Sequence, residues 1–207
     1  MTKRYQDYVI KDGKLVGKFE EMYREFDSPW QQTETEQLFS KSRHTACLNI
    51  RKFGIRSVVE FGSGLGYTSD MIQRATGANV LGIDISETAV KKAKDRFPQI
   101  EFRADSVENI ERYANYDAIL FAEITWYILP QLTSVFEKML KHFSGKYFLH
   151  NLVFYKGNTQ QYGKEYFRSL DEFVSYCPFR LLESTISTMA EENSTIETST
   201  IFKIEKK

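Results

Sequence analysis

The segment that decides the fold is Val58–Thr68, VVEFGSGLGYT, a hydrophobic run that enters a glycine-rich turn. Glycine adopts backbone conformations that a Cβ would forbid, and it lets the chain approach a ligand closely. A carboxylate, Glu60, stands two positions before the first glycine, and Asp84 ends the next hydrophobic run. The segment therefore predicts a β-strand that leads through a ligand-binding turn into a helix.

Strand-like and helix-like patterns alternate after residue 57. This alternation is typical of a mostly parallel sheet covered by helices on both faces. The last two β-rich runs are separated only by Ala190–Asn193, so they form a hairpin and the final strand runs antiparallel. We expect a Rossmann-like, doubly wound, three-layer α/β/α fold with seven strands. The predicted strands are 57–61, 79–83, 100–104, 116–121, 146–154, 179–188 and 195–205.

Residues 1–54 precede this alternating region and have a different pattern. A short helix is predicted over 18–26, where apolar residues recur at helical spacing, and Ser28-Pro29-Trp30 ends it. A second helix is predicted over 34–53, with Gly54 just beyond its end. We expect 1–54 to form a helical extension that lies as a lid over the active site. Residues 55–207 are expected to form the core, within one compact domain overall.

The composition argues against several classes of partner. Lys plus Arg and Asp plus Glu number 28 each, so the formal net charge is zero and there is no general attraction for nucleic acid or an anionic membrane. The longest apolar runs are too short to span a bilayer, and the N-terminus lacks a hydrophobic secretion segment. Cys47 and Cys177 have no metal-ligand spacing. We expect a cytoplasmic monomer or homodimer without a metal, membrane or nucleic-acid partner.

Acidic residues stand at the ends of successive predicted strands. In an open α/β sheet, ligands bind beyond the carboxyl ends of the strands. Three such ends are occupied by Glu60, Asp84 and Asp105. Burying a carboxylate there costs free energy unless a hydrogen-bond donor pairs with it. An adenosine that carries an amino-acid tail supplies suitable donors: an ammonium group, two ribose hydroxyls and an exocyclic amine. The pattern therefore favours a ligand of that kind.

Together these residues resemble the class I S-adenosylmethionine-dependent methyltransferases over roughly residues 55–207. Glu60–Gly66 is similar to the first motif of that family, and its G-x-G-x-G spacing differs from the G-x-G-x-x-G of dinucleotide binders. The resemblance implies S-adenosylmethionine as cofactor and S-adenosylhomocysteine as product. It implies that Asp84 binds the ribose, Ile85 packs on the adenine and Asp105 faces the adenine amine. The expected cofactor-binding residues are Glu60, Gly62, Ser63, Gly64, Gly66, Asp84, Ile85, Asp105, Ser106, Ala122 and Trp30.

Two further segments resemble the NodS-like N-methyltransferases. Phe26–Trp30 is similar to their Asp-Pro-Trp segment, and Ala122–Leu129 is similar to their Ala/Ser-Glu-x-x-Tyr-Tyr-Leu segment. The match is imperfect, since Ser28 replaces the Asp and Trp126 replaces the first Tyr. The resemblance implies an amine substrate and places Trp30 in the lid over the cofactor. The alternative is that Trp30 fills the core under a short helix.

The catalytic residues depend on the acceptor. An amine needs little besides positioning for an in-line approach, whereas a hydroxyl needs a general base. His150 is the candidate base, because strand 146–154 lies beside strand 116–121 and its end faces the cofactor. The alternative is a buried histidine that bonds to the backbone. Glu123 and Tyr127 are the other candidate catalytic residues, and the substrate rim is completed by Asn151, Tyr155 and Tyr162.

The function expected from the sequence is methyl transfer to a small-molecule acceptor, on nitrogen or oxygen. One alternative is a methyltransferase of RNA or protein on the same fold, although no Asn/Asp-Pro-Pro-Tyr segment follows strand 116–121. A second is a non-catalytic protein that binds the cofactor, because fold does not imply function. A nicotinamide-dependent oxidoreductase is disfavoured by the glycine spacing and by Glu60 in front of the turn.

Overall fold

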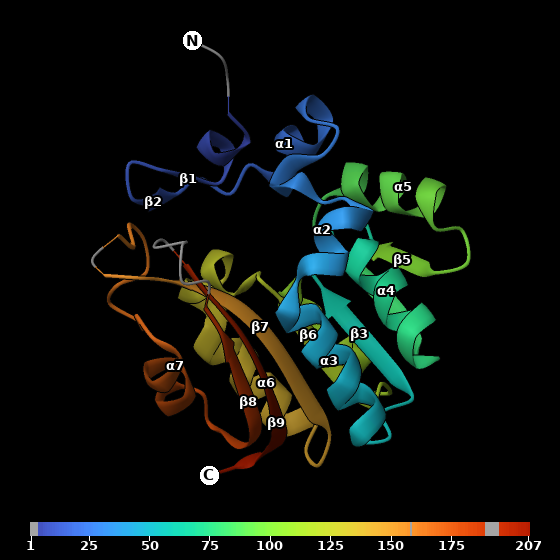
Figure 1. The fold of residues 1–207 in the computed structure, drawn as a ribbon, viewed down its shortest axis with the longest axis vertical. Helices are drawn as coiled ribbons and strands as arrows, with labels where there is room; N and C mark the ends of the chain where they lie inside the picture. The colour runs from blue at the N-terminus through green and yellow to red at the C-terminus, as the bar shows by residue number, and fades with distance from the viewer. Residues whose placement is uncertain (1–3, 158, 189–194) are drawn as a thin grey trace.

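The computed structural model describes residues 4–157, 159–188 and 195–207. Its centre is a seven-stranded sheet of order β5-β4-β3-β6-β7-β9-β8, with helices on both faces (Figure 1). This confirms the predicted Rossmann-like fold. The strands are β3 Ser57–Phe61, β4 Asn79–Asp84, β5 Glu101–Ala104, β6 Ala118–Ala122, β7 Tyr147–Tyr155, β8 Phe179–Ser187 and β9 Thr195–Lys206.

The strand pairing brings the strand ends that matter to one edge of the sheet. β3 pairs in parallel with both β4 and β6, and Phe61 lies opposite Ile83 on one side and Phe121 on the other. The order of strands reverses at β3, which is where open sheets of this type bind ligands. β9 runs antiparallel to β7 and β8, as expected, while the predicted turn at 190–193 lies outside the described residues.

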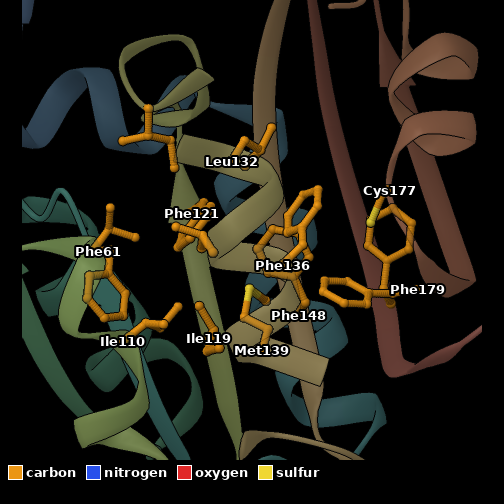
Figure 2. Close-up of a cluster of buried hydrophobic side chains, with 14 of the residues drawn as sticks. Phe61, Ile110, Ile119, Phe121, Leu132, Phe136, Met139, Phe148, Cys177 and Phe179 are labelled. Carbon is orange, nitrogen blue, oxygen red and sulfur yellow. The ribbon is translucent and has the colours of Figure 1, made fainter. Parts of the chain in front are cut away.

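Alternate residues of the strands are buried on the two faces of the sheet, where they form two large hydrophobic cores. α3 (Lys41–Lys52) and α4 (Tyr67–Thr76) cover the face that carries Val58 and Leu120. α6 (Leu132–His142) and α7 (Leu170–Tyr176) cover the opposite face. Figure 2 shows the second core, where Phe136 of α6 meets Phe148 of β7 and Phe179 of β8. None of the described helices is long and apolar enough to span a bilayer.

The remaining elements flank the sheet or join its strands. The N-terminal segment lies across one end of the sheet, in blue in Figure 1. It contains a two-stranded sheet that was not predicted, whose turn at Asp12 and Gly13 has positive φ angles of 51° and 71°. The elements that flank the sheet or join its strands are the 3₁₀ helices Tyr5–Tyr8, Pro29–Gln31, Val107–Tyr113, Thr125–Tyr127 and Leu129–Gln131, the strands β1 Ile10–Lys11 and β2 Lys14–Leu15, and the helices α1 Phe19–Glu25, α2 Glu34–Phe39 and α5 Glu87–Arg96.

The single helix predicted over 34–53 is wrong, because α2 and α3 are separate helices. Ser40 takes an extended conformation between them and caps α3. Glu197 of β9 accepts hydrogen bonds from Ser40 Oγ, from the Lys41 amide at 3.1 Å, and from the Ser42 amide and Oγ at 2.9 and 2.7 Å. A carboxylate at a helix N-terminus satisfies free amides and opposes the positive end of the helix dipole. A strand far along the chain therefore sets where α3 begins.

We expect Glu197→Ala to lower the free energy of unfolding by about 1–3 kcal/mol, because the donors at the start of α3 lose their acceptor. Burial acts to raise the pKa of Glu197, but hydrogen bonds from Ser40 and Ser42 outweigh it and lower the pKa. A lowered pKa stabilises the fold at neutral pH, so the deficit should shrink below about pH 4. Urea denaturation of the wild type and the variant measures this loss of unfolding free energy. The control is Glu205→Ala, which also lies on β9 and breaks an exposed ion pair with Arg180 of β8. It should cost below about 1 kcal/mol.

Candidate active site

A cavity lies at the carboxyl edge of β3, β4, β5 and β6, between the strand ends and the N-terminal segment. The core contributes Phe61, Gly62, Ile83, Asp84, Ile85, Asp105, Ser106, Val107, Ala122, Glu123, Ile124, Tyr127, Ile128 and Gln131. The N-terminal segment and α3 contribute Phe19, Tyr23, Trp30, Gln32 and Arg43. Most of the predicted site residues are in this lining. The predicted cofactor-binding and catalytic residues outside the lining are Glu60, Ser63, Gly64, Gly66 and His150.

The glycine turn is packed too closely for side chains. Gly62 has a φ of 73°, and a Cβ there would lie 2.0 Å from Ile124 Cγ2. A Cβ on Gly64 would lie 2.7 Å from both the Tyr23 hydroxyl and Gln32 Oε1. The turn is therefore packed between the loop after β6 and the N-terminal segment. Gly66 has a different role, because its Cβ would lie 2.6 Å from the Phe102 ring and it serves the packing of α4.

Glu60 lies beneath the turn, fully buried, and accepts a hydrogen bond from Ser69 Oγ. Burial raises the pKa of Glu60 to about 7, against the hydrogen bond from Ser69 and the charge of Arg43. Ser63 is also buried, and its hydroxyl has no partner among the described residues. Both were expected to bind the cofactor, and the structure places both behind the cavity wall.

Asp84 is a buried carboxylate at the cavity wall. Its Oδ2 accepts the Gly64 amide at 2.8 Å and its Oδ1 accepts the Ser86 amide at 2.9 Å. Burial raises its pKa to about 6, although the two amides favour the charged form. A carboxylate has about four acceptor positions, so Asp84 keeps capacity for hydroxyl donors in the cavity. The next residue, Ile85, is 63% exposed and offers an apolar surface beside it.

Asp105 lines the cavity but is engaged by its own loop. Its Oδ1 accepts the Ser106 amide and Asn109 Nδ2, at 2.8 and 2.6 Å. Its Oδ2 accepts the Tyr113 hydroxyl at 2.7 Å and Arg112 Nη1 at 3.4 Å. Burial acts to raise the pKa of Asp105, but these donors outweigh it and lower the pKa. The carboxylate expected to face an adenine amine therefore already has a full set of donors, and it braces the loop after β5.

Arg43 is a site residue that the sequence analysis missed. It is the one cation among the described residues that line the cavity, and its side chain is 14% exposed. Its Nη2 lies 3.8 Å from Glu123 Oε1, and its Nε is buried without a partner among the described residues. The guanidinium thus has donors available to an anion in the cavity. No local motif marks Arg43, because α3 reaches the cavity only through the fold.

Glu123 follows β6 in a strained conformation. Its φ is 68°, a left-handed value that non-glycine residues rarely adopt. Its amide donates to the Asn151 carbonyl at 2.9 Å, and its carboxylate is 39% exposed in the cavity. Such strain persists only where the surrounding structure holds it, and it clusters at functional sites.

Three rings form an aromatic wall of the cavity: Phe19, Trp30 and Tyr127. The Tyr127 ring centroid lies 5.5 Å from each of the other two. Trp30 also has a left-handed φ of 65°, and it hydrogen-bonds to the Tyr23 hydroxyl. Trp30 therefore lines the cavity, and it also packs against the buried cluster that contains Met22 and Tyr23 of α1.

The candidate base His150 lies away from the cavity. It is fully buried, stacks on Phe173 of α7 with centroids 4.0 Å apart, and its Nε2 lies 2.8 Å from Thr125 Oγ1. Burial lowers its pKa to about 3, so the imidazole is neutral. The general-base interpretation does not fit this geometry, because the pleat of β7 turns His150 toward α7. The expected rim residues Asn151, Tyr155 and Tyr162 are also outside the cavity lining.

Comparison with known proteins finds methyltransferases. Residues 58–144 match a family model described as a methyltransferase domain. Residues 58–144 are therefore similar in sequence to methyltransferase domains. Together with the fold, this match supports the class I superfamily and the S-adenosylmethionine cofactor that were expected from the sequence.

Several solved structures of methyltransferases are similar in fold to this chain. The N-methyltransferase NodS from Bradyrhizobium japonicum WM9, solved with S-adenosyl-l-homocysteine, is 14% identical with a TM-score of 0.65, over 88% of this chain and 96% of NodS. A protein described as a sarcosine dimethylglycine methyltransferase from Galdieria sulphuraria is 11% identical with a TM-score of 0.63, over 80% and 86%. The geranyl diphosphate C-methyltransferase from Streptomyces coelicolor A3(2) is 12% identical with a TM-score of 0.54, over 77% and 79%.

The buried Glu60 carboxylate predicts a pH-dependent stability. Since its folded pKa lies above the ordinary value of glutamate, its contribution to stability is fully present at low pH and is lost as the pH rises through about 7. Glu60→Gln cannot ionise. We therefore expect the unfolding free energy of the variant, relative to wild type, to rise by about 2 kcal/mol between pH 5 and pH 8.

Urea denaturation of the ligand-free protein at the two pH values measures this difference. Glu101→Gln, on the exposed edge strand β5, is the control and should show the same difference from wild type at both pH values. A constant difference for Glu60→Gln as well would contradict the raised pKa.

Proposed function

We propose that this methyltransferase transfers a methyl group from S-adenosylmethionine to the nitrogen of a small-molecule amine. The observation that carries the proposal is the pairing of the Glu123 carboxylate with the aromatic wall in one cavity, from which His150 is absent. A carboxylate and aromatic faces both attract an amine in its protonated form. The ammonium then gives its proton to the Glu123 carboxylate or to water, and the free nitrogen lone pair attacks the methyl group. A hydroxyl acceptor would need a base tuned near neutral pH, and the histidine expected for that role is buried elsewhere.

The cofactor fits the residues of the cavity. We assign Asp84 to the ribose hydroxyls, because it keeps free acceptor positions, and Ile85 to the adenine face. Arg43 has available donors for the carboxylate of the amino-acid tail, and Gly62 presents backbone to the cavity. The bound cofactor supplies an electrophilic methyl group on a sulfonium. The protein then has to hold the acceptor nitrogen in line with that methyl group.

The aromatic wall and Glu123 would orient the acceptor. A cation within about 6 Å of an aromatic ring gains roughly 0.5–2 kcal/mol. The Glu123 carboxylate carries the charge opposite to that of an ammonium group. Its backbone has a strained, left-handed φ and is held by the hydrogen bond from its amide to the Asn151 carbonyl. The names of NodS and of the Galdieria protein describe enzymes that methylate nitrogen or amino acids, which supports an amine acceptor.

A small acceptor is favoured over RNA or protein. Residues 19–43 cover the cavity, and the glycine turn is in contact with Tyr23 and Gln32 of this cover. The chain has no net charge to attract a polyanion. We therefore assign 1–54 the role of a lid over a small-molecule site in the core formed by 55–207.

Incubation with radiolabelled S-adenosylmethionine and a panel of amines, each paired with the alcohol of the same skeleton, tests the proposal. We expect label in amines and none in the matched alcohols. RNA and protein substrates are run in parallel, and preferential labelling of either would overturn the small-molecule assignment. Calorimetry with S-adenosylhomocysteine separately tests the cofactor site, and a protein that binds it but labels nothing would be a non-catalytic binder.

Glu123→Gln keeps the shape of the side chain and removes its charge. We expect kcat/KM for an amine to fall by about tenfold or more, equivalent to at least ~1.4 kcal/mol, while the Kd of S-adenosylhomocysteine changes by less than about threefold. Glu137→Gln, on the exposed face of α6, is the matched control and should behave as wild type. An unchanged kcat/KM in Glu123→Gln would remove Glu123 from the acceptor site.

A further inference from the structure

The start of helix α5 is hydrogen-bonded to a carboxylate of another helix, Glu20 of α1. Ser86 is its N-cap and accepts the Ala89 amide at 3.1 Å. In a capping box, the residue at the position of Ala89 is a Glu or Gln that reaches back to the cap, and alanine has no such group. The Ser86 amide, which that group would accept, donates to Asp84 instead, and Glu20 of α1 accepts other donors at this helix start. Its Oε2 accepts Ser86 Oγ at 2.6 Å and the Thr88 amide at 3.2 Å, and its Oε1 accepts Thr88 Oγ1 at 2.7 Å.

Several hydrogen-bond donors stabilise the ionised form of the Glu20 carboxylate. Partial burial acts to raise its pKa, but hydrogen bonds from Ser86 and Thr88 outweigh it and bring the pKa to about 2. Arg24 Nε lies 2.8 Å from Oε1 as well. The carboxylate is therefore ionised at neutral pH, where it opposes the positive end of the α5 dipole.

A second tie joins the other end of α1 to α5. Lys92 Nζ donates to the Tyr23 carbonyl at 2.9 Å and to the Phe26 carbonyl at 3.0 Å. The two ties hold α1 at both ends, and Met22 and Tyr23 pack against Ala89 between them. Helix α1 is thus docked on α5.

The same contacts lead into the cavity. Phe19 and Tyr23, on either side of Glu20 in α1, line it. The Ser86 amide donates to Asp84 Oδ1 at 2.9 Å, while the Ser86 hydroxyl donates to Glu20. One serine therefore links the carboxylate of the covering helix to the carboxylate at the cavity wall.

We propose that Glu20 is a positioning residue for cofactor binding. It holds α1 with its aromatic side chains over the cavity, and it fixes Ser86, which orients Asp84. The inference rests on the proposed function, because it takes this cavity as the S-adenosylmethionine site. Glu20 itself does not line the cavity and touches neither cofactor nor acceptor.

The test compares Glu20→Ala and Glu20→Gln with Glu21→Ala, which changes the neighbouring, exposed glutamate of the same helix. For Glu20→Ala we expect the Kd of S-adenosylhomocysteine and the KM of S-adenosylmethionine to rise about tenfold, with kcat within about threefold of wild type. Glu20→Gln should be intermediate, since its amide oxygen can still accept. A role in stability alone would lower the folded fraction and the apparent kcat, and would leave KM and Kd unchanged.

A folded Glu20→Ala that binds S-adenosylhomocysteine as tightly as wild type would overturn the proposal. Should Glu20→Ala fail to fold, Thr88→Val removes one donor to Glu20 and should raise the same Kd about threefold. Trypsin cleavage after Arg24, without ligand, tests the docking of α1 independently. It should be at least about fivefold faster in Glu20→Ala than in Glu21→Ala, and equal rates would overturn the docking role. If wild type does not bind S-adenosylhomocysteine, the proposed function fails while the cleavage assay still decides the docking.

Discussion

The site depends on one buried carboxylate, Asp84, and on the two backbone amides that bond to it. The Gly64 amide belongs to the turn after β3, and the Ser86 amide belongs to the start of α5. Burying a carboxylate is costly, and hydrogen bonds to the charged form offset that cost. The same two bonds lock the glycine turn and α5 in place, so the ligand-binding loop is organised around the group that is proposed to meet the ribose.

The surrounding charges form a chain that runs along this edge of the sheet. Glu20 caps α5 through Ser86, Asp84 accepts from Ser86 and the turn, and Glu60 lies beneath the turn within the field of Arg43. Arg43 in turn lies near Glu123 at the far wall. Each carboxylate is held either by backbone amides, by hydroxyls or by this arginine. A cationic cofactor with an amino-acid tail would add positive charge where the burial of carboxylates is most costly.

Much of the fold was predictable because its signals are local. The alternation of strands and helices and the antiparallel pairing of the last two strands are confirmed by the sheet. The predicted glycine turn follows β3 and leads into α4. The break between α2 and α3 was not predictable, because it depends on Glu197, which is more than 150 positions further along the chain. The β1–β2 hairpin carried a local signal, Asp12-Gly13, that the sequence analysis did not use.

The sequence by itself determined the sheet, the turn and the acidic strand ends, because hydrophobic periodicity and glycine spacing act over a few residues. Only the tertiary structure decided which side chains share the cavity. The pleat of β7 turned His150 toward Phe173, and the loop after β5 engaged Asp105 with its own donors. The packing of α1 and α3 brought Glu20 to α5 and Arg43 to Glu123. These contacts join residues far apart in the chain, and no local pattern encodes which partners the folded chain will bring together.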